Sequence, residues 1–292
     1  GAINKITDWS NVSVVYKATS VDELNSALAQ VVAGKPVTIE LAGDFSDTEK
    51  KEVVITTAEG ANVVIDAEGA TLPKHFVVKL NKYANNNNDV KRANGRKGNY
   101  TLRKFNTEVL SVGVTGTTVA VTECTLEYLD FWGGNAAVAI TDNTIDGKGV
   151  KHERIDGNLH NYGIYIALIN YDLSIERNSV TNTLSHAIGI NGLTSTFREY
   201  ASYNAYSTIS SFTGNTLTKI GAYDNNRVGF KCWDDVTYAP TAAATIDDLP
   251  EAGKNLILAV DADATNVFSK DAHSSNNAYK FDFFDCKYAP LQ

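Results

Sequence analysis

The 292-residue chain is poor in the residues that mark several common classes of protein. Its three cysteines lie far apart, so neither a disulfide framework nor a zinc site built on closely spaced thiols is expected. Acidic residues outnumber basic ones, 34 to 26, and the formal net charge of −8 argues against a nucleic-acid-binding protein. No apolar run is long enough for a transmembrane segment. Methionine is absent and the chain starts at Gly1, so we expect that an export signal preceded this position and was removed.

What the chain does contain is a short pattern that recurs through its middle. Hydrophobic residues make up 43% of the sequence and charged residues 21%, which is enough apolar material for a sizeable core. The pattern reads apolar, two polar residues, Asn, a small hydroxyl residue and apolar, followed after a gap by an apolar-Gly-apolar strand. Copies of the first half are Val121–Leu126, Ile140–Ile145, Ile175–Val180 and Phe212–Leu217, and copies of the second half are Tyr162–Ile164, Ala187–Ile190 and Arg227–Phe230. Repetition of a short β unit at a variable period predicts a stacked solenoid.

The central positions of the pattern are Asn143, Asn178 and Asn215, with Cys124 in the place of Asn in the first copy. A sharp bend between two short strands needs one residue in the left-handed region, which Asn tolerates better than other non-glycine residues. Its amide can also hydrogen-bond the equivalent amide of the next coil. We therefore predict that the three asparagines stack in one column, although Asn-Thr and Asn-Ser are also common turn dipeptides.

This repeat resembles that of right-handed parallel β-helix proteins of the pectin-lyase-like superfamily. Their coils carry a Gly-Ile-x-Ile strand, an Ile-x-x-Asn bend and a short third strand, and the similarity covers residues 109–233. The resemblance implies an all-β fold, a right-handed parallel β-helix of the secreted bacterial type. It says little about function, because the superfamily includes lyases, hydrolases, adhesins and binders without catalytic activity.

A helix with clear end signals precedes the repeats. Ser20 is a good N-cap, Glu23 completes a capping box, and Leu24 begins an apolar stripe. Gly34 ends the predicted helix, which spans residues 20–33. Laid across the first coil, an amphipathic helix would cover apolar interior and free strand edges. The alternative is the βαβ start of a doubly wound fold, but no Gly-rich phosphate loop follows.

We predict a single domain, residues 1–292, because no linker is evident. Residues 1–45 would form the N-terminal strand and cap helix, 46–240 the main coils with loop insertions, and 241–292 the C-terminal coils. In the last part, the apolar run Leu256–Val260 predicts a buried strand, and Asn266 marks a further, weaker bend.

The glycines of the strand copies indicate where a partner would bind. If the three strands align on Gly163, Gly189 and Gly229, these glycines form an outward column, since side chains alternate across a strand. A shallow track of this kind suits an extended polymer better than a small molecule. Its polar walls would include Tyr165, Asn191 and Lys231.

We interpret the chain as an extracellular or cell-surface protein, secreted to a bacterial envelope, that interacts with polysaccharide without turnover; the localisation follows from the resemblance alone. The insertion Asp146–Asn161 holds the densest group of titratable side chains in the chain. No cofactor is required, and neither nucleic acid nor a membrane span is expected. The predicted substrate-binding residues are His152, Arg154, Tyr165, Asn191 and Trp233.

Two alternatives remain at this point. A polysaccharide lyase or glycoside hydrolase acting on uronic-acid-containing glycans would use Arg227 and Lys231 as catalytic residues, with Ca²⁺ held by Asp234 and Asp235. Against it, the calcium cluster and Arg-Pro motif of pectate lyases and the carboxylate signatures of polygalacturonases have no match. The second alternative is an adhesin or structural spacer.

Overall fold

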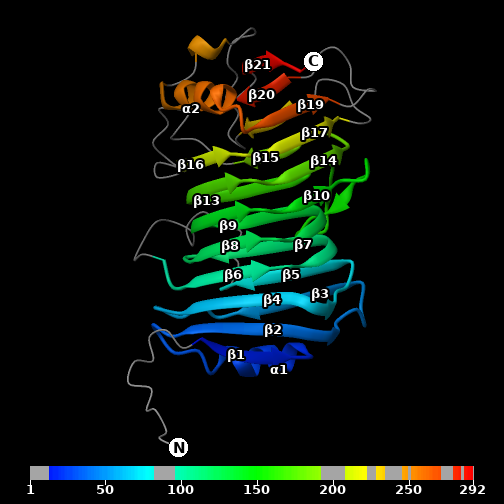
Figure 1. Ribbon diagram of the computed structural model, residues 1–292, viewed down its shortest axis with the longest axis vertical. Helices are drawn as coiled ribbons and strands as arrows, with labels where there is room; N and C mark the ends of the chain where they lie inside the picture. The colour runs from blue at the N-terminus through cyan, green and yellow to red at the C-terminus, as the bar shows by residue number, and fades with distance from the viewer. Residues whose placement is uncertain are drawn as a thin grey trace, which may run out of the picture.

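Strands dominate the computed structural model, which describes residues 13–81, 96–191, 208–221, 228–233, 245–248, 251–270, 279–283 and 286–291. Within these residues, nineteen strands form one sheet, and two more form a separate hairpin. Every strand pairing is parallel except those of the hairpin and of the last two strands of the sheet. The strands stack one above another along the long axis of the molecule (Figure 1). The predicted all-β, largely parallel architecture is confirmed at this level.

The strands of the sheet fall into three columns according to their pairing partners. The first column comprises β1 (Val14–Ala18), β2 (Pro36–Asp44), β4 (Asn62–Thr71), β6 (Asn99–Arg103), β8 (Thr118–Thr122), the last parts of β9 (Thr125–Thr141) and β13 (Ile164–Glu176), and β16 (Thr208–Thr213). The second comprises the starts of β7 (Asn106–Thr115) and β9, then β10 (Thr144–Asp146), β14 (Ser179–Thr183), β17 (Thr216–Ile220) and β19 (Val267–Lys270).

The third column carries most of the residues of the candidate site. It comprises β3 (Lys50–Ile55), β5 (His75–Leu80), the remainder of β7, the middle of β9, the start of β13, β15 (Ile188–Asn191), β18 (Val228–Trp233) and β20 (Tyr279–Phe283), followed by the antiparallel β21 (Cys286–Pro290). The separate hairpin consists of β11 (His152–Glu153) and β12 (Leu159–His160). Because β9 and β13 run through more than one column, the columns are continuous with one another.

Alternation along each strand separates a core side from an outer side. In β7, Leu110, Val112 and Val114 are buried in the main hydrophobic core, and the residues between them lie on the outer face. The core extends along the stack from Ala18 to Leu291. Burial of apolar side chains from successive strands in one shared core is what holds the columns together.

The first helix, α1 (Val21–Leu28), lies beyond β1 at the end of the strand stack (Figure 1). Its N-cap prediction is confirmed: the Ser20 hydroxyl accepts a hydrogen bond from the Glu23 N–H at 3.2 Å, and the Glu23 carboxylate accepts one from the Thr19 N–H at 2.7 Å. Leu24 is buried in the main core. The helix ends at Leu28, earlier than the predicted residue 33.

The run Leu256–Val260 is not a strand, and that prediction is wrong. It belongs to α2 (Glu251–Ala262), which follows a short 3₁₀ turn, η1 (Ile246–Asp248). Ile257 and Val260, three residues apart, are buried, while Leu258 is 40% exposed, which is a helical pattern. A short apolar run does not by itself distinguish a buried strand from one side of a helix. Neither helix in the described residues is long and apolar enough to cross a membrane.

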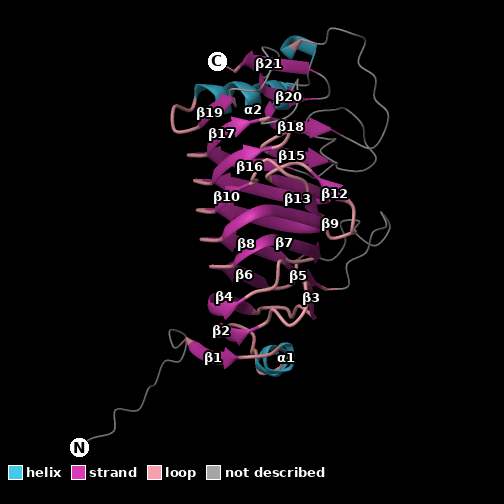
Figure 2. Ribbon diagram, turned by 90° about the vertical axis from the view of Figure 1, so that its right-hand side faces the viewer, coloured by secondary structure: helices cyan, strands magenta, loops and turns pink. Residues whose placement is uncertain are grey.

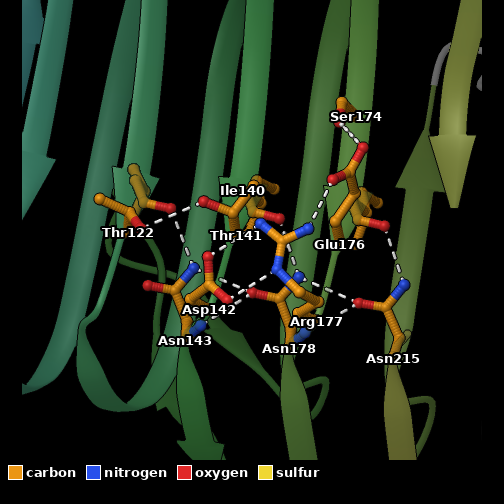
Figure 3. Close-up of polar contacts among 12 residues, drawn as sticks. Thr122, Ile140, Thr141, Asp142, Asn143, Ser174, Glu176, Arg177, Asn178 and Asn215 are labelled. Atoms are coloured by element: carbon orange, nitrogen blue, oxygen red, sulfur yellow. Dashed lines mark hydrogen bonds and ion pairs between the residues drawn. The ribbon is translucent and has the colours of Figure 1, made fainter. Parts of the chain in front are cut away.

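The predicted stacking of asparagines is confirmed (Figure 3). The Asn178 side-chain oxygen accepts hydrogen bonds from Asn143 N at 3.1 Å and Nδ2 at 2.9 Å, and the Asn215 oxygen accepts the equivalent pair from Asn178 at 3.0 and 3.1 Å. All three are almost completely buried. The weaker bend at Asn266 continues the ladder, since its side-chain oxygen accepts from Asn215 N at 3.0 Å. At the other end, the Asn143 oxygen accepts from Cys124 N at 3.0 Å.

The prediction that asparagine itself takes the left-handed conformation at these bends is wrong. The left-handed conformation belongs to the residue before each central position: Glu123, Asp142, Arg177 and Gly214, with φ between 54° and 67°. Asparagine is therefore used for its amide, which also donates to a backbone carbonyl such as Ile140 O, 2.8 Å from Asn178 Nδ2. The residues that precede the ladder positions also contact one another. The Arg177 guanidinium donates to both oxygens of Asp142, and these hydrogen bonds hold the pKa of that carboxyl below its ordinary value.

Candidate functional site

The predicted column of glycines does not form. Ile164 pairs with Ile188 and Ile188 pairs with Phe230, so Gly189 lies between Tyr165 and the backbone of Lys231. This register differs by two residues from the predicted one. A shift of two leaves every side chain on the same face, so alternation alone does not select between the registers.

Gly163 has a packing role instead. A Cβ atom at this position would lie 2.4 Å from Val180 Cγ1 and 2.9 Å from the Ala187 carbonyl oxygen. The glycine allows the chain to approach neighbouring strands closely as it enters β13.

The predicted site residues have different outcomes. Tyr165 lies on the outer side of the third column, as expected, but only 3% of it is exposed. Asn191, Lys231 and Trp233 lie on β15 and β18, where the structure describes the backbone and not these side chains. Arg227, Asp234 and Asp235 lie outside the described residues, so the catalytic and calcium-binding assignments stay predictions.

Tyr165 is covered by the insertion that follows β10. We call residues 147–161 the strap. It contains the β11–β12 hairpin and lies over the outer side of the third column, where β12 runs beside β9 and β13 (Figure 2). At its base, Gly149 N donates to Asn182 O at 2.7 Å, and within it Arg154 N donates to Asn158 O at 2.8 Å. The strap thus brings its own charged side chains onto the sheet.

Asp130, in the middle of β9, connects the sheet to the backbone of the strap through its side chain. It accepts hydrogen bonds from Ile155 N at 3.0 Å, from Trp132 Nε1 at 2.8 Å and from the Ser111 hydroxyl on the neighbouring strand. Burial raises the pKa of the Asp130 carboxyl to about 6, against the effect of these hydrogen bonds and of the Arg154 charge. A buried carboxyl of this kind is poised to change its charge near neutral pH.

His75 extends the same polar network. Its Nε2 lies 2.7 Å from Ser111 Oγ, and its Nδ1 lies 3.6 Å from Glu153 Oε1, without a hydrogen-bond partner. Glu153, on the strap, is paired with Lys50 at 2.8 Å. Burial, followed by the Lys50 charge, lowers the pKa of His75 to about 4. A connected series of charged and polar side chains therefore joins the strap to the sheet: Lys50, Glu153, His75, Ser111 and Asp130.

Aromatic rings fill the space beside this network. The His160 ring centroid lies 4.0 Å from that of Tyr162 and 4.2 Å from that of Tyr165, and its Nδ1 is 3.3 Å from the Tyr128 hydroxyl. His152 stacks on Tyr128 at 5.9 Å, and it also lies 3.8 Å from the Glu127 carboxylate. Burial, followed by the Arg154 charge, lowers the pKa of His160 to about 3. Both strap histidines are thus packed against tyrosines.

Arg154 lies over the outward aromatic side chains of the sheet. Its guanidinium carbon is 4.9 Å from the Trp132 ring centroid and 5.7 Å from that of Tyr165, and it is paired with Asp156 through two nitrogens. We call Tyr128, Trp132, Tyr162 and Tyr165, all on or beside β9 and β13, the aromatic platform. Trp132 and Tyr162 are half-buried and form its accessible part, and Arg154 beside them is half-buried as well.

An open groove of about 390 Å³ lies over the second column and includes Lys148 at the base of the strap in its lining. Its walls carry three carboxylates, Glu108, Glu127 and Asp146, and two lysines, Lys74 and Lys148. Asp146 is bonded to Lys148 at 2.8 Å. Nowhere in the described residues do three His, Cys, Asp or Glu side chains gather closely enough to hold a metal ion.

Sequence reasoning singled out Arg154, His152 and Tyr165 but not Ser111 or Asp130. The available signal was a polar residue between two apolar ones inside a strand, as in Leu110-Ser111-Val112 and Leu129-Asp130-Phe131. Such a residue lies on the outer face, where a polar side chain is unremarkable until something covers it. Comparison with known proteins gives no further guide, since no family model, curated protein or solved structure matches this chain.

Proposed function

We propose that the chain is a right-handed parallel β-helix of the pectin-lyase-like kind, capped by α1, exported to a bacterial envelope or exterior, and that it binds polysaccharide without turnover. The three columns of parallel strands and the asparagine ladder support this architecture. The burial of Leu24 against the first strands supports the capping role of α1. Export and a bacterial source rest on the resemblance of the repeat alone.

The observation that carries the binding function is the aromatic platform with Arg154 above it. Sugar rings stack on aromatic faces, and a guanidinium beside them binds carboxylate or hydroxyl groups. Trp132, on β9, and Tyr162, just before β13, are partly accessible and lie at a long sheet whose strands repeat at regular spacing, which suits an extended chain. The platform is therefore the proposed contact surface for a polysaccharide, and an Arg at its centre favours one that carries uronic acids.

Replacing Arg154 by alanine should weaken glycan binding by about tenfold or more, because the cation beside Trp132 is lost. Binding to immobilised polygalacturonate and alginate measures this. Arg177→Ala is a matched control: Arg177 also pairs with an aspartate through two nitrogens, but at the bends. Equal binding by the two variants and the unmodified chain would remove the platform as the binding site.

A second candidate is a lyase or hydrolase, and the raised pKa of buried Asp130 beside Arg154 is the observation that favours it, because such shifts are common among catalytic groups. The proposal of binding without turnover predicts no products from a panel of uronic-acid polymers, with or without Ca²⁺. Ultraviolet absorbance of unsaturated products would show a lyase, and new reducing ends would show cleavage of the polymer. Either result would contradict binding without turnover. Loss of that activity in Lys231→Ala would then test the predicted catalytic residue.

A further inference from the structure

Titratable groups make several of the contacts between the strap and the sheet, in addition to the backbone hydrogen bonds at its base. Three of its contacts reach two strands: Glu153 contacts Lys50 on β3, and Ile155 N and His160 contact Asp130 and Tyr128 on β9. The apolar residues at this interface form a small cluster separate from the main core, consisting of Val109, Tyr128 and Tyr165 with partly buried neighbours. A segment with few apolar contacts and many polar ones is among the first parts of a fold to open.

Two histidines at this interface are buried beside a cation, and burial and that cation together outweigh the nearby carboxylates Glu153 and Asp156 in favouring the neutral imidazole. His160 lies among three tyrosine rings and near the Arg154 guanidinium. His75 is 5% exposed, and its Nδ1 has no hydrogen-bond partner. Both are accommodated as neutral imidazoles while the strap is docked, and solvent would stabilise their charged forms if it opened.

We propose that the strap is an acid-released clamp, which holds Arg154 over Trp132 at neutral pH and leaves the sheet on acidification, so that a bound glycan is released. The opening of the strap rests on the contacts above. The release of glycan rests in addition on the proposed function.

The pH dependence of docking involves every polar or charged group that faces the two histidines. His160 faces three side chains beside or on the sheet and two on the strap: Tyr128, Tyr162, Tyr165, Arg154 and Asp156. His75 faces Lys50, Glu153 and Ser111, and it is linked to Asp130 through Ser111.

The histidines and Asp130 act in opposite directions. A histidine whose pKa is about 3 or about 4 when docked and 6.5 when free is neutral in both states well above pH 6.5, and it increasingly opposes docking as the pH falls below that value. Between pH 7 and pH 5, each histidine favours opening by about 20-fold. Asp130, with a pKa near 6 when docked and 3.8 when free, favours docking over the same interval by about 10-fold. The net expectation is opening on the order of 50-fold.

Hydrogen exchange measured by mass spectrometry tests the clamp on the intact chain. After correction for the intrinsic effect of pH on exchange, protection of residues 147–161 should fall on the order of 50-fold from pH 7 to pH 5. Protection of β9 and β13, the strands beneath, should stay constant. Unchanged strap protection, or an equal loss in strap and strands, would overturn the proposal.

Variants test the direction in which strap protection changes with pH. In the double variant His75→Gln, His160→Gln the contributions of these two histidines are removed and that of Asp130 is kept, so strap protection should rise by about 10-fold from pH 7 to pH 5 instead of falling. Each single variant should leave a fall of about 2- to 3-fold, which keeps the test available if the double variant does not fold. A double variant that still loses protection on acidification would contradict the assignment.

Binding to polygalacturonate and alginate at the two pH values separates this inference from the proposed function. Weaker binding at pH 5, in step with strap opening, supports the clamp. Strap opening with no binding at either pH removes the glycan function and leaves the acid-sensitive strap in place. Strap opening with equal binding at both pH values contradicts the clamp.

Discussion

Asn178→Ala should destabilise the protein by about 4 kcal/mol, because four buried hydrogen bonds of one side chain are lost together. The Asn178 oxygen accepts from the Asn143 N–H and Nδ2, and the Asn178 Nδ2 donates to the Ile140 carbonyl and the Asn215 side-chain oxygen. Each unsatisfied buried group contributes about 1–3 kcal/mol of destabilisation, and some relaxation is expected. The effect is a large share of the stability of a typical domain, about 5–15 kcal/mol.

Urea unfolding followed by circular dichroism gives the comparison. Asn158→Ala is the control: Asn158 is exposed on the strap, and its side chain is bonded only to Asp156. It should change the free energy of unfolding by less than about 1 kcal/mol. A loss at Asn178 as small as that of the control would mean that the ladder adds little to stability.

Gly133→Ala should be at least as damaging, and we expect a loss of about 4 kcal/mol or more, or failure to fold. The added Cβ would lie 1.9 Å from the Val114 carbonyl oxygen, on the strand next to β9, and the backbone φ of +122° is one that residues with a side chain rarely adopt. A strand paired on both sides has little room to move. The clash is therefore not relieved by a side-chain rotation.

Gly157→Ala separates the clash from the backbone effect. Gly157 also has a positive φ, +84°, but nothing lies within 4 Å of the added Cβ. Only conformational strain of about 1 kcal/mol is expected there. Thermal unfolding of both variants measures the difference, and a Gly133 variant as stable as the Gly157 variant would show that the strands at this corner yield easily.

The repeat allowed the ladder to be predicted because its chemistry is local. An apolar residue, two polar residues and Asn place the amide at a bend whatever the rest of the chain does, and the spacing of Asn143, Asn178 and Asn215 did not matter. Register was harder, because a shift of two residues conserves the faces and only close packing, such as that of Gly163, selects one.

The strap was identified as a segment rich in charge, but its partners were not. His75 and Asp130 precede it by many residues, and neither has a local motif that marks it. Their significance arises when the segment folds back over them, an event that depends on the length and path of the insertion. Tertiary contacts between a loop and outward positions of several strands have no periodic signature in the sequence.

The ladder also bears on how such a chain can change. Its successive members are 19, 35, 37 and 51 residues apart, yet the geometry from one to the next is nearly the same, with backbone N–H to side-chain oxygen distances of 3.0 or 3.1 Å. The amount of polypeptide between members is thus uncoupled from their alignment. The insertions between ladder residues, the strap among them, can therefore be lengthened, removed or exchanged, in evolution or by design, while the sheet beneath keeps its shape.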